Sequence, residues 1–339
     1  MADDASPNMR EERASGTTRE ERASGTTEHD ALRTELRQVL GLAALSLAAA
    51  AKLAGIAAST LSAWMAGKYA GDNDRVAADV RKWLDSRRAG ARARSVLPPV
   101  LGFVLTETAD RFLDTLEHAQ YVVDMVVIAG GAGVGKTTAA RRYASENPNV
   151  WLLTCEPSIG STHAMLDYLC TALNVAERSS NKRAHAVQKR LTSSEGLLIV
   201  DEAQHLTTQA LDQLRSIHDQ AGVGIALIGN EEVYGRLDGG GRVAKFAQLT
   251  SRIGMKATRV RPTAKDVDAL LDAYGVAGAR ERGLLRDVAR RPGALRGMVK
   301  TLRLAHMLAA GAEAEAMTAD HILAAKARLT RVDDAGDAP

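Results

Sequence analysis

Two hydrophobic patterns follow one another along the chain. Residues 29 to 88 form a helical block, and from about residue 101 short β-branched runs alternate with longer helical segments. These runs are VVDMVVIAG, VWLLTC, LLIVD and GIALIG. Alternation of strands with helices predicts an α/β domain with a mostly parallel sheet. Beyond residue 262 only helical segments continue, which predicts a small all-α lid.

The same patterns divide the chain into six segments. We predict a disordered tail (1–28), an all-α domain (29–88), a linker (89–100), an α/β core (101–262), a helical lid (263–330) and a second disordered tail (331–339). The first tail holds REERASGTT twice in tandem, a polar duplication that cannot bury a core. The stretch RRAGARARSVLPP, residues 87–99, covers most of this linker; it is basic and is closed by two prolines.

Residues 53 to 69, LAGIAASTLSAWMAGKY, have the spacing of a DNA-reading helix-turn-helix. Such a motif needs a small residue inside the first helix, a glycine at the turn and apolar residues that fix the second helix. Ala51 and Gly55 fit the first two requirements, and Leu61 and Trp64 lie at core spacing beyond them. The predicted DNA contacts are Ser59, Thr60, Ser62 and Lys68. Short side chains favour weak sequence preference, and an ordinary helical hairpin is the alternative interpretation.

GGAGVGKTT, residues 130 to 138, follows a strand-like run and opens a helix, as a phosphate-binding loop requires. Its glycines let backbone N–H groups wrap the phosphates. Lys136 is placed to reach the β and γ phosphates, and Thr137 is placed to offer its hydroxyl to Mg²⁺. The predicted nucleotide contacts in this loop are Gly130, Gly131, Ala132, Gly133, Val134, Gly135, Lys136, Thr137 and Thr138. ATP and Mg²⁺ are therefore the expected cofactors.

LLIVDEAQHL, residues 197 to 206, supplies a second part of the same chemistry. Its apolar residues predict a buried strand, and Asp201 at the strand end is placed to orient Mg²⁺. Glu202 is then placed to polarise the attacking water as a general base. The run GIALIGN ends in Asn230, which could hold that water or the γ phosphate. Together these residues predict hydrolysis of ATP.

Two arginines beyond these motifs are further candidates. Arg252, in FAQLTSRIG, follows a predicted helix and is our choice for an arginine finger supplied to a neighbouring subunit, with Arg236 and Arg242 as alternatives. Arg296, in RRPGALR, falls in the first turn of a lid helix and could touch the nucleotide from above. A plain surface position is the alternative for Arg296.

Charge and cysteine usage narrow the choice of partner and compartment. The net charge is only +3, but residues 81–94 carry six Lys or Arg against one Asp, and residues 256–303 carry twelve against five acidic residues. We expect phosphate contacts there, with solvated helix faces as the alternative. Cys155 and Cys170 are the only cysteines, which fits a reducing cytoplasm. No apolar run suggests a membrane span or a secretory signal.

Taken together, the motifs resemble those of AAA+ ATPases, and among them the B proteins of Mu-like transposable phages. The resemblance covers roughly residues 30 to 328 and rests on the helix-turn-helix, GGAGVGKT with its DEAQHL partner, Asn230, the SRIG segment and the basic helical end. It implies an AAA+ P-loop core with a small helical lid and an all-α N-terminal domain. It also implies an ATPase that forms homo-oligomeric filaments on double-stranded DNA, with little sequence preference, and that delivers target DNA to a transposase and stimulates it in the host cytoplasm.

Three other functions share some or all of these motifs. A helicase loader or transposon regulator would share every motif. A nucleotide-switched transcription regulator would bind a single operator, and footprinting on random DNA would separate it from a broad DNA binder. An ATPase that serves secretion or cell-wall assembly could carry a DEAQHL-type motif, but the N-terminal DNA reader argues against it.

Overall fold

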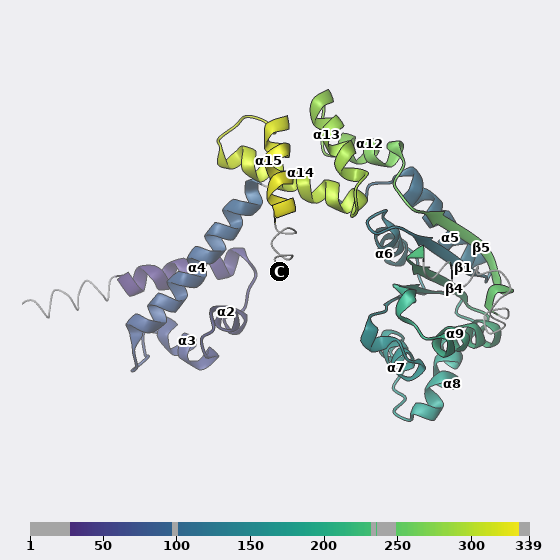
Figure 1. The fold of residues 1–339 in the computed structure, drawn as a ribbon. Helices are drawn as coiled ribbons and strands as arrows, with labels where there is room; N and C mark the ends of the chain where they lie inside the picture. The colour runs from purple at the N-terminus through teal and green to yellow at the C-terminus, as the bar shows by residue number, and fades with distance from the viewer. Residues whose placement is uncertain (1–27, 97–100, 232–234, 236–248, 332–339) are drawn as a thin grey trace, which may run out of the picture. The chain divides into compact units, whose positions relative to one another are not determined.

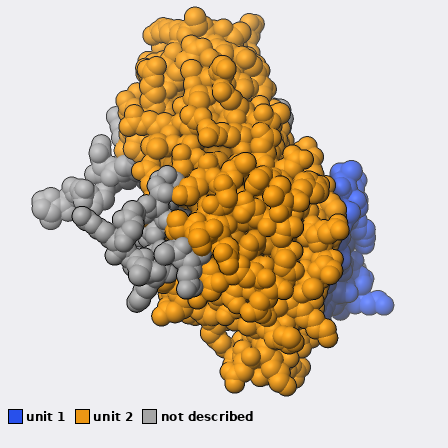
Figure 2. Space-filling model, turned by 90° about the vertical axis from the view of Figure 1, so that its right-hand side faces the viewer, with its two compact units in different colours: residues 1–96 blue, residues 97–339 orange. Residues whose placement is uncertain are grey.

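The computed structural model describes residues 28–96, 101–231, 235 and 249–331. These residues divide into two compact units, residues 1–96 and residues 97–339, which Figure 2 distinguishes by colour. The REERASGTT repeat and the alternative fingers Arg236 and Arg242 lie outside the described residues.

The first unit is all-α, as predicted. Its helices are Glu28–Leu42, α2 (Leu47–Ala54), α3 (Ala58–Met65) and α4 (Asn73–Val96). Trp64 is fully buried at its centre, with Leu36 and Leu61 packed in the same cluster. Gly55 ends α2 with a left-handed φ of 71°, a conformation that glycine adopts without strain. The two short helices and the turn glycine therefore stand where the sequence predicts them, while the DNA-reading role stays a prediction.

Within the described ranges, no single helix has the length and apolar character needed to cross a membrane. Helix Glu28–Leu42 and α2 pass that test of length and composition only as a pair, bent by 113°.

The boundary of the linker differs from the prediction. α4 continues to Val96, so the first eight residues of the predicted linker, 89–96, are helical. Arginine and alanine dominate this stretch and are strong helix formers, so they outweigh the cost of the single Gly90. Pro98 lies just beyond the last helical residue, and a proline disfavours helical geometry in the residue before it.

The second unit is built on a five-stranded sheet in the order β2–β3–β4–β1–β5. Figure 1 labels three of these strands, β1, β4 and β5. The strands are β1 (Met125–Gly130), β2 (Val150–Thr154), β3 (Leu197–Asp201), β4 (Gly224–Gly229) and β5 (Ile253–Arg259). All four strand pairs are parallel. The four runs predicted as strands form β1 to β4, so the predicted α/β parallel architecture is confirmed. β5 is an addition to that prediction.

Helices cover both faces of the sheet. α5 (Glu107–Tyr121) and α6 (Lys136–Glu146) pack on one face, where Ile128 of β1 is buried. α7 (Thr162–Ala172), α8 (Ser180–Leu191) and α9 (Thr208–Ala221) pack on the other, where Val127 of β1 is buried. Neighbouring residues of a strand point to opposite faces, so apolar side chains throughout β1, β3 and β4 fill two cores at once. The carboxyl ends of these strands meet at one edge of the sheet.

The rest of the second unit is helical, as predicted for the lid. Its helices are α12 (Ala264–Ala273), α13 (Ala279–Ala289), α14 (Ala294–Gly311) and α15 (Ala319–Arg331). They enclose a core of their own in which Leu271, Leu285, Met298 and Ile322 are buried.

Asp266 joins the lid to the α/β core. Its side chain is fully buried and accepts hydrogen bonds from the Thr108 backbone N–H at 2.9 Å, the Thr108 hydroxyl at 2.6 Å and the Thr263 backbone N–H at 2.7 Å. Burial alone would raise the pKa of Asp266, but the hydrogen bonds from Thr108 and Thr263 outweigh burial and hold the pKa below its ordinary value. One carboxylate thus caps α12 and ties it to the start of α5.

Asp266→Asn is expected to lower the free energy of unfolding by about 1–3 kcal/mol at neutral pH, because the amide cannot accept at both positions and leaves a buried donor unpaired. The pKa of Asp266 is depressed in the folded protein, so its stabilisation is complete above the unfolded-state pKa and is lost as the pH falls through the folded-state pKa. Urea unfolding should therefore show wild type and variant converging as the pH falls below about 4.

The matched control is Asp320→Asn, which changes a mostly exposed lid aspartate that lies 3.8 Å from Arg280. Its unfolding curve should stay close to wild type at every pH. A constant gap between wild type and Asp266→Asn over the whole pH range would contradict the assignment.

Candidate nucleotide-binding site

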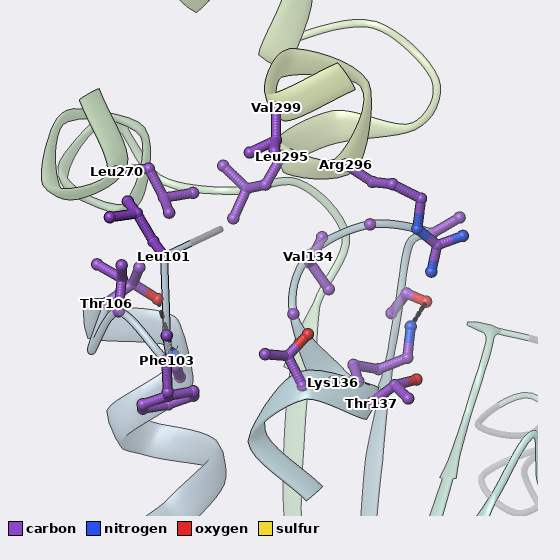
Figure 3. Close-up of a pocket in the computed structure, with 18 of the residues that line it drawn as sticks. Leu101, Phe103, Thr106, Val134, Lys136, Thr137, Leu270, Leu295, Arg296 and Val299 are labelled. Carbon is purple, nitrogen blue, oxygen red and sulfur yellow. Dashed lines mark hydrogen bonds between the residues drawn. The ribbon is translucent and has the colours of Figure 1, made fainter. Parts of the chain in front are cut away.

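A pocket of about 360 Å³ opens at the carboxyl edge of the sheet, between the 130–138 loop, the lid and residues 101–106. Figure 3 shows Lys136 and Thr137 at one end and Leu101, Phe103 and Leu270 at the other. The predicted site residues that line it are Gly130, Ala132, Gly133, Val134, Gly135, Lys136, Thr137, Thr138, Glu202, Asn230 and Arg296. One end is thus polar and cationic, and the other is apolar.

Close backbone contacts explain three glycines of the loop. A Cβ on Gly130 would stand 1.9 Å from the carbonyl oxygen of Arg259, and a Cβ on Gly131 would stand 2.2 Å from that of Val260. A Cβ on Gly133 would meet the carbonyl oxygen of Gly293, in the lid, at 2.1 Å. Only glycine fits at these positions, so the loop is held between the end of β5 and the start of α14.

Lys136 is the first residue of α6, and its side chain bends back over the loop. Its Nζ donates hydrogen bonds to the carbonyl oxygens of Gly130 at 2.7 Å and Gly131 at 2.9 Å. Burial lowers the pKa of Lys136, while the nearby carboxylates of Glu202 and Asp201 oppose that change. The α6 N-terminus and the ammonium group together favour an anion at this end of the pocket.

Asp201 is buried beneath the pocket, and its two carboxylate oxygens differ. Oδ1 accepts the Glu202 backbone N–H at 3.0 Å, whereas the buried Oδ2 has no hydrogen-bond partner within the described ranges. Burial raises the pKa of Asp201, and the Thr137 hydroxyl is the main group that opposes the rise. A buried oxygen without a donor next to a hydroxyl fits a hard cation or its bound water. The residues present therefore fit Mg²⁺, with Thr137 and Asp201 as its predicted holders.

Arg296 and Arg252, the two predicted arginines, lie in different places. Arg296, on α14, lines the pocket from the lid side (Figure 3). Arg252 precedes β5, whose first residue pairs with Met125 at the start of β1. The pocket lies at the other end of β1, about 20 Å away for a six-residue strand. Arg252 thus does not meet the pocket of its own chain; its Nε donates to Asp219 Oδ1 at 2.8 Å.

The apolar end of the pocket was not predicted from the sequence. Apart from glycine and alanine, its residues are Leu101, Phe103, Val104, Thr106, Leu270, Tyr274, Leu295 and Val299. They come from the segment before α5 and from two lid helices, so no local motif joins them. An apolar slot beside a phosphate loop fits the flat face of a nucleotide base.

The predicted DNA contacts of the first unit are accessible. Ser59, Ser62 and Lys68 are exposed and Thr60 is half-buried. Several charges in the predicted basic stretches already have partners within the chain, because Arg88 pairs with Glu35, Arg282 with Asp272 and Arg286 with Asp268. Those arginines are less available for phosphates.

α8 carries a basic surface that we did not single out from the sequence. Residues 178–194 contain five Lys or Arg and no acidic residue. Lys182, His185 and Lys189 are exposed, while Arg183 pairs with Asp167 and Arg190 lies over the Trp151 ring. The sequence signal for this basic surface was the absence of acidic residues from 178 to 194. Counting charges in short windows along the chain would have found it.

Two protein-family models match the chain. A model described as an AAA domain matches residues 123–237, and one described as the C-terminal part of the Mu B transposition protein matches residues 251–329. The chain is 39% identical over 260 residues to the ATP-dependent target DNA activator B of Escherichia phage Mu, which covers 76% of this chain and 82% of the phage protein. It is 33% identical over 275 residues to the Mu-like prophage FluMu DNA transposition protein B of Haemophilus influenzae, with 80% and 94% covered.

Solved structures with a similar fold include DNA complexes of origin recognition proteins. The Aeropyrum pernix ORC1 protein in complex with DNA has a TM-score of 0.52 and 18% identity, over 70% of this chain and 69% of that chain. Drosophila ORC bound to DNA has a TM-score of 0.51 and 17% identity, over 70% and 65%. At this identity, the similarity supports the fold and nothing beyond it.

Proposed function

This chain belongs to the Mu B family of AAA+ ATPases, and we propose that it assembles head to tail on target DNA. The assembly then delivers the DNA to a transposase and stimulates that transposase. ATP occupancy controls assembly, and hydrolysis releases the DNA. The separation of Arg252 from the pocket of its own chain is the observation that carries this proposal. A site that needs an arginine from a neighbour is complete only in an assembly.

In the proposed hydrolytic step, each residue acts at a stated place. Lys136 and the N-terminus of α6 bind the phosphates, and Arg296 adds a cation from the lid. Glu202 takes a proton from the attacking water, which Asn230 helps to position. Mg²⁺ held by Thr137 and Asp201 would neutralise charge on the β and γ phosphates. Arg252 of the next subunit would stabilise charge that develops in the transition state.

DNA binding follows from repetition of weak contacts along the assembly. Each subunit offers a few cations, and we propose that those of α8, chiefly Lys182 and Lys189, contact phosphates of the duplex. A row of subunits adds these contacts, so affinity comes from avidity rather than from base reading. The first unit would add Ser59, Thr60, Ser62 and Lys68 as further contacts.

Duplex retention on filters is expected to require ATP, to depend little on sequence and to fall steeply with salt, because phosphate contacts release counterions. Random and defined duplexes of equal length should compete equally in a salt series with a non-hydrolysable ATP analogue. Stimulation of strand transfer by a cognate transposase into the same duplexes tests the delivery step. One strongly preferred site at every salt concentration would instead support the transcription-regulator function.

Charge reversal of two α8 lysines tests in the same filter assay whether this helix contacts the DNA. Lys182→Glu with Lys189→Glu should reduce the slope of log affinity against log salt by about two per subunit, since each neutralised phosphate contributes about 0.9. The matched control reverses Arg291 and Lys300, two exposed cations of the predicted 256–303 stretch. A larger loss in that control than in the α8 variant would move the DNA contact to the lid.

A further inference from the structure

We propose that Gln204 is a positioning residue that holds the carboxylate of Glu202 at a fixed place relative to the end of β4. Gln204 belongs to the short 3-10 helix η2 (Ala203–His205), which directly follows Glu202. The inference rests on the proposed role of Glu202 as the general base, and it adds a residue that does not itself line the pocket.

The side-chain amide of Gln204 bridges two parts of the pocket wall. Its Nε2 donates a hydrogen bond to Glu202 Oε2, and its Oε1 accepts the backbone N–H of Asn230 at 3.4 Å. Glu202 and Asn230 both line the pocket, one at the end of β3 and one at the end of β4. Gln204 therefore connects the proposed base to the proposed water-holding strand end.

The two partners leave only one orientation for this amide. A carboxylate can only accept hydrogen bonds and a backbone N–H can only donate, so the NH₂ of Gln204 must face Glu202 and its carbonyl must face Asn230. Glutamate at this position would present acceptors to Glu202, and alanine would remove both hydrogen bonds. A side chain that both donates and accepts is what the bridge requires.

The hydrogen bond from Gln204 also gives the two carboxylate oxygens of Glu202 different roles. Oε2 is held by the amide, so Oε1 is the oxygen left to take a proton from a water above the phosphates. Glu202 has a left-handed backbone conformation, with φ of 56° and ψ of 38°, so the extended backbone of β3 ends at Asp201. An unusual backbone with one carboxylate oxygen tied down holds the other in a narrow range of positions, as general-base catalysis needs.

The test compares steady-state ATP hydrolysis on DNA for Gln204→Ala, Gln204→Glu and the control Gln209→Glu, which places the same charge on the exposed surface of α9. Gln204→Ala should lower kcat about 10-fold or more with KM for ATP within about twofold, because positioning rather than binding is lost. Gln209→Glu should resemble wild type at every pH.

The pH profile distinguishes positioning from general structural damage. At about pH 8 Gln204→Glu should be slower than Gln204→Ala, since two carboxylates then face each other. As the pH falls towards about 6, its rate relative to wild type should rise, because the introduced carboxyl becomes protonated beside a like charge and then both donates and accepts, as the amide does. A rate ratio that is flat with pH would overturn the proposal, as would a Gln204→Ala variant within twofold of wild type.

Two further measurements separate the possible failures. Thermal unfolding and titration with a fluorescent ATP analogue show which variants fold and bind. If Gln204→Ala does not fold, the near-isosteric Gln204→Glu still gives the pH dependence of the rate relative to wild type. Glu202→Gln tests the premise and should slow turnover about 10²-fold or more. Turnover of Glu202→Gln within a few-fold of wild type would overturn the base assignment and this inference together, whereas a slow Glu202→Gln with unaffected Gln204 variants would overturn this inference alone.

Discussion

Arg252→Ala is expected to lower ATP turnover on DNA about 10³-fold while the isolated subunit still binds ATP almost normally. The pocket contains Lys136 and Arg296 from its own chain, but Arg252 lies at the opposite edge of the sheet and is bound to Asp219. Removing it therefore leaves the binding pocket intact and removes only the charge that a neighbour would supply in the transition state. Turnover and binding of a fluorescent ATP analogue are measured on the same preparation.

Mixing two inactive variants tests whether the arginine acts between subunits. Equimolar Arg252→Ala and Lys136→Ala should recover part of the activity, because the Arg252→Ala subunit keeps its loop, the Lys136→Ala subunit keeps its arginine, and one head-to-tail interface between them pairs the two intact parts. The control is Arg215→Ala, since Arg215 also binds Asp219, at 2.7 Å, but is not the proposed finger. Arg215→Ala should keep most of its turnover. A mixture with no recovery would mean that each subunit completes its own site.

Lys136→Ala is expected to abolish ATP binding and, with it, ATP-dependent retention of DNA. Lys136 provides an ammonium group at the end of the pocket where the α6 N-terminus also points, and neutral alanine cannot replace that charge against phosphates. Fluorescent-nucleotide titration should show no saturable binding, and filters should retain the duplex no better with ATP than without it.

Lys265→Ala is the matched control for this prediction, because Lys265 is an exposed lid lysine that does not line the pocket. It should bind nucleotide like wild type. Retention of DNA by Lys136→Ala with ATP at the wild-type level would show that the loop does not control DNA binding.

The phosphate end of the site was predictable because the residues that form it are consecutive in the sequence. A strand, a glycine-rich turn and a helix start occupy consecutive residues, so Lys136 and Thr137 are placed by their own segment. Asp201 and Asn230 were predictable for a related reason, since each ends a buried strand and parallel strands end at one edge. Neither inference needed knowledge of how distant segments pack.

The missed features depend on contacts between distant segments. β5 reads IGMKATR, and as an edge strand with only Ala257 fully buried it lacks the continuous apolar run that marked the inner strands. Leu101 and Leu295 line one pocket only because the lid folds over the core, so no sequence spacing predicts that they lie in the same site. The bond between Arg252 and Asp219 likewise joins a strand start to a helix 33 residues earlier.

In the proposed assembly, the opposite positions of the pocket and Arg252 would also give a row of subunits two chemically different ends. The terminal subunit whose pocket receives no arginine would leave the row with its ATP intact and could bind again at once. The terminal subunit at the other end would have hydrolysed its ATP with its neighbour's help, so it would leave with ADP and would have to exchange nucleotide before it returned. Such a row would be kinetically polar, with rapid renewal at one end and net loss of subunits at the other.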